Sequence, residues 1–109
     1  MSELVIHAYG LCTAGCDHGR IDPAQVVLCR AWLRRWAYRR RYINRMRGSY
    51  RLKHDVESAP GGFYVTNGAF ILAAILEGYR AIPCASGSPN AYFDLGIRKA
   101  PRPIVELSA

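Results

Sequence analysis

The stretch DPAQVVLCRAWLRRWAYRRRYINRMRG, residues 22–48, decides the fold predicted for this chain. Asp22 is suited to a helix N-cap, and Pro23 suits the first helical position, where an amide hydrogen would have no partner anyway. No glycine or proline follows until Gly48. The pattern therefore predicts one helix of up to about 25 residues, on the order of 37 Å long.

The side chains of this predicted helix separate into an apolar and a basic side. The apolar side carries Val26, Cys29, Trp32, Leu33, Trp36 and Ile43. The opposite side carries Arg30, Arg34, Tyr38, Arg41 and Arg45. Near the apolar side lie Arg39, Arg40 and Arg47. The last three turns are thus basic almost all round, and we expect that half to project from the core.

The positive charge of the whole chain comes from this segment. Residues 30–53 hold ten basic residues and no acidic one, while the rest of the 109-residue chain holds five basic and eight acidic residues. Like charges such as Arg30 and Arg34, four residues apart, destabilise a helix unless they meet a counter-charge. The formal net charge of +7 therefore indicates a polyanionic partner, either nucleic acid or an acidic protein surface.

Composition places the chain among globular proteins. Half of its residues are apolar and 21% are charged, which predicts one folded domain over residues 1–109. The longest apolar run, residues 69–76, is far shorter than a membrane-spanning helix, and no secretion signal is evident at the N-terminus. We therefore expect a cytoplasmic protein with no membrane partner.

Glycines and prolines divide the rest of the chain into short elements. Ser49 is placed to cap a second helix over 50–58, and Thr66 or Asn67 to cap a third, which ends at Gly78. The apolar stripe of the third helix consists of Phe70, Ile71, Ala74 and Ile75.

Short β-prone runs lie at both ends of the chain. The runs YRAIPC (79–84) and AYFDLGI (91–97) flank a Ser-Gly-Ser-Pro-Asn turn and predict a β-hairpin. A strand is predicted over 4–9, a loop over 10–19, and an edge strand or loose segment after residue 98. The predicted class is α+β: one long basic amphipathic helix, two shorter helices and a small antiparallel β-sheet, to which the N-terminal strand is a possible addition.

The cysteines offer one candidate metal site. In a reducing cytosol all four are expected to be thiols. A C-x3-C-x-H…C array of the kind that closes a tetrahedral structural zinc site is formed by Cys12, Cys16, His18 and Cys29. The spacing departs from the usual two-residue knuckle, and Cys29 also fits the apolar stripe. We expect no cofactor, with zinc as the alternative.

No catalytic constellation is evident in the sequence. His54 and Asp55 are adjacent and would point about 100 degrees apart on a helix. We therefore expect no enzyme.

The second and third helices followed by a hairpin match the order of a winged helix, but the third offers few polar side chains for reading bases. Because the order of elements matches, a sequence-specific DNA-binding regulator is an alternative, but it is not the function that we favour.

The segments SYRLKHDVE, FYVTNGAFILAAILEGYR and SPNAYFDLG, within residues 49–95, resemble small uncharacterised proteins of phages and mobile elements. The resemblance covers under half of the chain, and no functional residue carries over from it. It implies a bacterial host cell, where such proteins often act by stoichiometric binding, including anti-CRISPR and other anti-defence inhibitors.

These observations favour a non-enzymatic binding protein that engages nucleic acid, or a nucleoprotein complex of host defence, and acts by occlusion. Most contacts are expected from Arg34, Arg41 and Arg45. The full predicted partner-binding set is Arg30, Arg34, Arg35, Tyr38, Arg39, Arg40, Arg41, Tyr42 and Arg45. A second alternative is a protein-only inhibitor that docks on an acidic surface, because a row of carboxylates would attract the same arginines.

Overall fold

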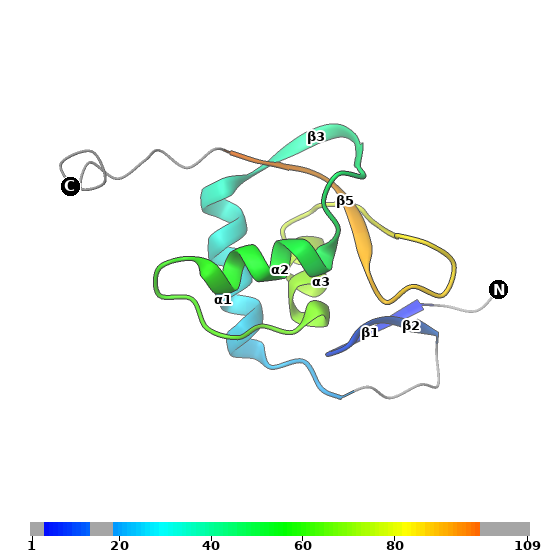
Figure 1. The fold of residues 1–109 in the computed structure, drawn as a ribbon, viewed down its shortest axis with the longest axis horizontal. Helices are drawn as coiled ribbons and strands as arrows, with labels where there is room; N and C mark the ends of the chain where they lie inside the picture. Colours follow the sequence, from blue (N-terminus) through cyan, green and yellow to red (C-terminus); the bar gives the residue numbers. More distant parts are fainter. Residues whose placement is uncertain (1–3, 14–18, 99–109) are drawn as a thin grey trace.

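The computed structural model describes residues 4–13 and 19–98 (Figure 1). The order of elements is β1 (Leu4–His7), β2 (Gly10–Thr13), α1 (Pro23–Trp36), β3 (Ala37–Asn44), α2 (Ser49–Ser58), α3 (Asn67–Leu76), β4 (Ala81–Pro83) and β5 (Ala91–Ile97). The predicted α+β class is confirmed: these residues form three helices and two small antiparallel sheets.

The single long helix predicted from residue 23 onward is wrong. Helix α1 ends at Trp36, and the chain continues without a loop into β3. Two physical reasons favour the strand. A helix over these residues would have crowded arginines on every side, whereas tyrosine and isoleucine suit a strand. Strand β5 also supplies a pairing edge, with Ala37 opposite Ile97 and Tyr38 opposite Gly96.

Strand β3 forms one edge of a three-stranded sheet in the order β3-β5-β4. The predicted C-terminal hairpin is confirmed, because β4 pairs antiparallel with β5. The β3–β5 register is regular up to Arg39 opposite Leu95, then shifts before it resumes at Asn44 opposite Phe93. The residues between Arg39 and Asn44 therefore leave the regular ladder as an irregular, bulged segment.

The N-terminal strand pairs elsewhere. Strand β1 pairs with β2 in a separate two-stranded sheet, so the loop expected over residues 10–19 is wrong for residues 10–13. This hairpin lies against the start of α3, where the Gly68 N–H donates to the Ala8 carbonyl at 3.0 Å. A Cβ atom at Gly68 would collide with the His7 carbonyl, so only glycine permits this contact.

The two short helices lie where the sequence places them. Thr66 is the N-cap of α3, and its side chain accepts a hydrogen bond from the Ala69 N–H at 3.2 Å. The residue that precedes α2 is Gly48, whereas Ser49 is the first residue of the helix. The buried Ser49 hydroxyl instead accepts from the Ala91 N–H at 3.0 Å and ties α2 to β5.

The core lies between the helices and the inner face of the larger sheet. Phe70 of α3 is at its centre, with its ring edge-to-face against Trp32 at 6.2 Å and against Phe93 at 5.7 Å. Leu33 of α1 and Leu52 of α2 belong to the same core cluster and are fully buried.

Within the described residues, no helix has the length and apolarity that a membrane span requires.

Candidate nucleic-acid interface

The exposed side of β3 carries the densest group of basic side chains. Ala37 is buried, and the next five residues, Tyr38 to Tyr42, are all exposed. Tyr42 is 70% exposed. Strand β3 is an edge strand with side chains exposed on both of its faces, so the consecutive Arg40 and Arg41 are both on the surface.

The arginines of α1 have a different environment. Glu77, which follows α3, accepts from Arg30 Nε at 2.6 Å and from Arg34 Nε at 2.9 Å. The hydrogen bond from Arg34, together with that from Arg30, outweighs partial burial and holds the pKa of Glu77 below its ordinary value. The sequence led us to expect the counter-charge of Arg30 and Arg34 from a partner, whereas a distant part of the chain supplies a carboxylate to both.

Arg39 anchors β3 to the rest of the sheet. Its Nη1 donates at 3.0 Å to Asp94, a carboxylate only 2% exposed, and its Nη2 donates to the Gly78 carbonyl. Arg80 donates to the same carboxylate through its backbone N–H at 2.8 Å and its Nε at 3.0 Å. Burial raises the pKa of Asp94, but these bonds and the charge of Arg39 more than offset it and leave the pKa lowered.

Four of the predicted arginines have no carboxylate partner in the described part of the chain: Arg35, Arg40, Arg41 and Arg45. Aromatic rings orient three of them. The guanidinium of Arg41 lies 5.6 Å from the ring centre of Tyr42, that of Arg45 lies 5.6 Å from Tyr92, and that of Arg35 lies 4.8 Å from Trp36. Such stacking holds a guanidinium in place while its N–H groups still face outward.

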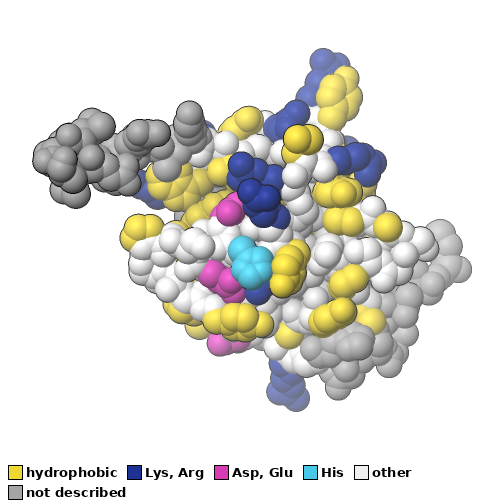
Figure 2. Space-filling view, in the orientation of Figure 1, with side chains coloured by type: hydrophobic (Ala, Val, Ile, Leu, Met, Phe, Trp, Pro, Cys, Tyr) yellow, Lys and Arg dark blue, Asp and Glu magenta, His cyan; other side chains and the backbone are white. Residues whose placement is uncertain are grey.

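The predicted site residues are thus divided between two surfaces. Figure 2 shows arginine and lysine side chains gathered over the end of the molecule where Figure 1 places β3 and the residues after it. Arg30, Arg34 and Arg39 are bound to carboxylates, while Arg40, Arg41, Arg45, Tyr38 and Tyr42 are presented to solvent. We call the latter five residues the β3 surface.

The proposed zinc ligands are only partly within the described residues. Cys16 and His18 lie outside them. Cys12 is disulfide-bonded, which corrects the expectation of four thiols. Cys29 is a buried free thiol, and desolvation together with the nearby Glu57 raises its pKa to about 12. The described residues contain no group of three metal-binding side chains, and the zinc site stays a prediction.

Sequence reasoning missed the two carboxylates that organise the arginines. A signal for both exists in the sequence. Glu77 directly follows the apolar run of α3, and Asp94 stands in the middle of the apolar strand AYFDLGI. A charged side chain within a buried segment requires a partner. The arginine-rich segment is the richest source of such partners, so both carboxylates could have been matched to it from the sequence alone.

Comparison of the chain with protein-family models, with curated proteins and with solved structures finds no match.

Proposed function

We propose that this protein binds single-stranded nucleic acid through the β3 surface and acts by binding, without a catalytic step. One observation carries the proposal: each acidic side chain in the described part already has a partner, and the arginines of the β3 surface remain unpaired. The engaged carboxylates are Asp22, Asp55, Glu57, Glu77 and Asp94. Phosphate groups would supply the missing counter-charge.

The tyrosines of the β3 surface favour a single strand over a duplex. Tyr42 and Tyr38 are exposed beside the unpaired arginines, and Arg41 already stacks on Tyr42. Unpaired bases stack on such rings, whereas the bases of a duplex are stacked on one another and do not offer their faces. An acidic protein surface would neutralise the arginines but would gain little from exposed tyrosine rings.

The biological setting belongs to the same proposal. The resemblance to phage and mobile-element proteins favours the nucleic-acid path of a host defence complex as the target. Occupation of this path by a small basic protein, or capture of the strand that should enter it, would block the complex by occlusion.

Fluorescence anisotropy with labelled single-stranded DNA, RNA and duplex DNA across a salt series tests the proposal. We expect the single strands to bind most tightly and the logarithm of affinity to fall linearly with the logarithm of salt concentration. The variant Arg40→Gln/Arg41→Gln should bind the single strands about 100-fold more weakly, because each charge-assisted contact that is lost contributes about 1.5 kcal/mol. The control Arg30→Gln/Arg34→Gln changes the net charge equally and should lose far less.

Three outcomes would overturn the proposal. Equal losses in the two double variants would mean that net charge, and not the β3 surface, causes binding. Loss of all binding at physiological salt would favour an acidic protein partner. Strong discrimination between duplex sequences would favour a DNA-binding regulator.

A further inference from the structure

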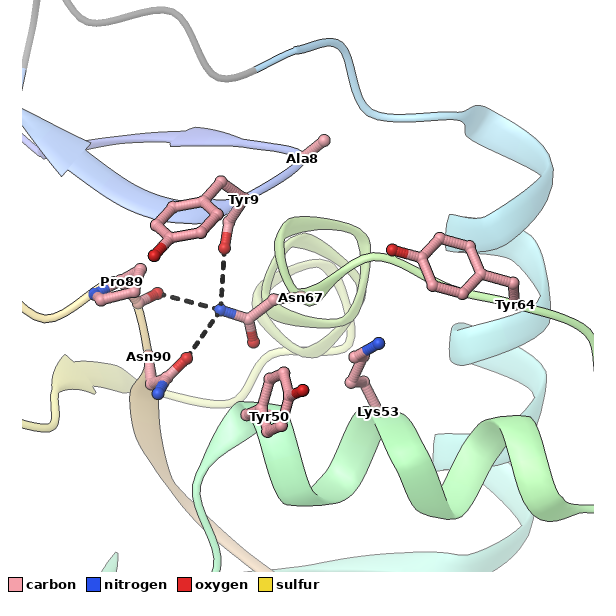
Figure 3. Close-up of a pocket in the computed structure, with 8 residues that line it drawn as sticks. All are labelled: Ala8, Tyr9, Tyr50, Lys53, Tyr64, Asn67, Pro89 and Asn90. Atoms are coloured by element: carbon pink, nitrogen blue, oxygen red, sulfur yellow. Dashed lines mark hydrogen bonds between the residues drawn. The ribbon is translucent and has the colours of Figure 1, made fainter.

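A second candidate site lies in a pocket to which β3 contributes no side chain. The pocket has a volume of about 300 Å³, at the lower end of the range for small-molecule sites. Its walls come from the β1–β2 turn, from α2, from the start of α3 and from the turn before β5. Figure 3 shows Asn67, Lys53, Tyr50 and Tyr64 around this space.

Asn67 is fixed in one orientation. Its side-chain nitrogen faces three oxygen acceptors: the Tyr9 carbonyl at 3.1 Å, the Pro89 carbonyl at 3.1 Å and Asn90 Oδ1 at 2.9 Å. A flipped amide would turn its oxygen toward these three oxygens, so the assignment is unambiguous. Gly10 permits this packing, because a Cβ atom there would collide with both the Pro89 carbonyl and the Asn67 amide.

This orientation leaves one buried acceptor without a partner. Asn67 is only 6% exposed, and its Oδ1 has no hydrogen-bond partner in the described structure. In Figure 3 this oxygen points away from the hairpin, toward the space between Tyr50 and Lys53. An unsatisfied buried carbonyl costs free energy, which a ligand with an N–H donor would recover.

Lys53 supplies a charged donor in the same pocket. The residue is only 6% exposed, and its Nζ bonds to Glu57 at 3.2 Å. Nζ also lies 4.7 Å from the ring centre of Tyr64 and 5.3 Å from that of Tyr50. An ammonium has three hydrogens, so at least one remains for a ligand acceptor. The pocket thus combines an acceptor, a cationic donor and two aromatic rings.

We propose that this pocket binds the base of a nucleoside whose edge has an N–H donor next to a carbonyl, as in uracil, thymine and guanine. The N–H would donate to Asn67 Oδ1, and Lys53 Nζ would donate to the carbonyl, whose negative oxygen suits a charged donor. Tyr64 and Tyr50 would contact the ring. The proposal goes beyond the β3 surface, because a free nucleoside has no phosphate for the arginines.

Isothermal titration calorimetry with uridine, guanosine and 3-methyluridine tests the site. Uridine and 3-methyluridine form a matched ligand pair, since they differ only at N3, where a methyl group replaces the hydrogen of the N–H donor. We expect uridine and guanosine to bind and 3-methyluridine to bind at least tenfold more weakly. The variant Lys53→Met should lower the affinity for uridine at least tenfold. The control Phe63→Ala, which removes the exposed ring next to Tyr64 in the sequence, should leave this affinity unchanged.

The outcomes separate this proposal from the one above. The proposal that the pocket binds a nucleoside base would be overturned if neither uridine nor guanosine bound, or if uridine and 3-methyluridine bound equally well. The ligand pair needs no substitution, so the test stands even if Lys53→Met does not fold. The variant Arg40→Gln/Arg41→Gln should lose its binding of single-stranded DNA and retain its binding of uridine. A result that overturns the proposal for the β3 surface would therefore leave the proposal for the pocket intact.

Discussion

Two arginines of α1 and two of β3 belong to one uninterrupted basic segment, yet they have opposite surroundings. Glu77 binds both Arg30 and Arg34, so these two guanidinium groups share a counter-charge within the protein. Arg40 and Arg41 have no carboxylate within the described chain and extend from a bulged edge strand. Local charge density is therefore a poor guide to a binding surface, because distant carboxylates decide which arginines remain available.

Arg39 lies at the boundary between the two groups. It belongs to β3, but its guanidinium is bound by Asp94 and by the Gly78 carbonyl, and it lies 5.2 Å from the Tyr79 ring centre. These contacts hold the start of β3 against the sheet. The position of the unpaired arginines thus depends on an arginine that is itself structural.

The largest expected effect comes from removing that anchor. Asp94→Ala should lower the free energy of unfolding by about 3 kcal/mol, because it removes a buried carboxylate and leaves the Arg80 N–H without its acceptor. Urea unfolding followed by circular dichroism measures the loss. The control Asp55→Ala breaks a more exposed ion pair with Arg47 and should cost about 1 kcal/mol or less. Equal costs would show that Asp94 does not anchor β3.

Much of this fold was predictable from local chemistry. The cap at Asp22, the third helix from Thr66 to Gly78 and the C-terminal hairpin all follow from capping, turn and apolar patterns. The end of α1 did not follow, because residues 37–44 have no glycine or proline to stop a helix. The strand depends on pairing with β5, and its paired residues are 49 to 60 positions apart in the sequence, so the contact leaves no local signal.

The candidate site was predictable only as a set of residues. The arginines and tyrosines of the β3 surface were all in the predicted set, but a helix would have placed Arg34, Arg41 and Arg45 together. The structure pairs Arg34 with Glu77, leaves Arg41 on β3 and places Arg45 just after that strand. The pocket at Asn67 was missed, since an asparagine at a helix start is ordinarily a cap and its unpaired oxygen is visible only in three dimensions.

A smaller effect should follow from removing the ring of Tyr42. Tyr42→Ala should lower the affinity for single-stranded DNA by about tenfold, because a base stacked on an aromatic ring contributes about 1 to 3 kcal/mol to binding. Anisotropy at fixed salt measures the change. Met46→Ala, which removes an exposed apolar side chain just beyond β3, should have no effect. If both variants lose equally, stacking on Tyr42 is not part of the interface.

The ion pairs of Arg30 and Arg34 with Glu77 should also have a pH signature. Because the folded-state pKa of Glu77 is lowered, its stabilising contribution is present above its unfolded pKa, about 4.3, and is lost as the pH falls through the folded value. Glu77→Gln should therefore lower the free energy of unfolding by about 0.5 to 1 kcal/mol at pH 7 and by less at pH 3. Urea unfolding at both pH values measures this. A cost that is the same at both would show that the Glu77 charge contributes no stability.

The same substitution should have the smallest and most telling effect on binding. Glu77→Gln releases Arg30 and Arg34 from their shared carboxylate, so single-stranded DNA should bind a few-fold more tightly, at about 0.5 to 1 kcal/mol for two exposed charges. Asp22→Asn is the matched control: it changes the net charge equally, keeps a side chain that caps α1, and should leave affinity nearly unchanged. Anisotropy at low salt measures both. If the two variants gain equally, net charge alone explains the increase. If Glu77→Gln gains more, its carboxylate is what keeps the α1 arginines from binding as the β3 arginines do.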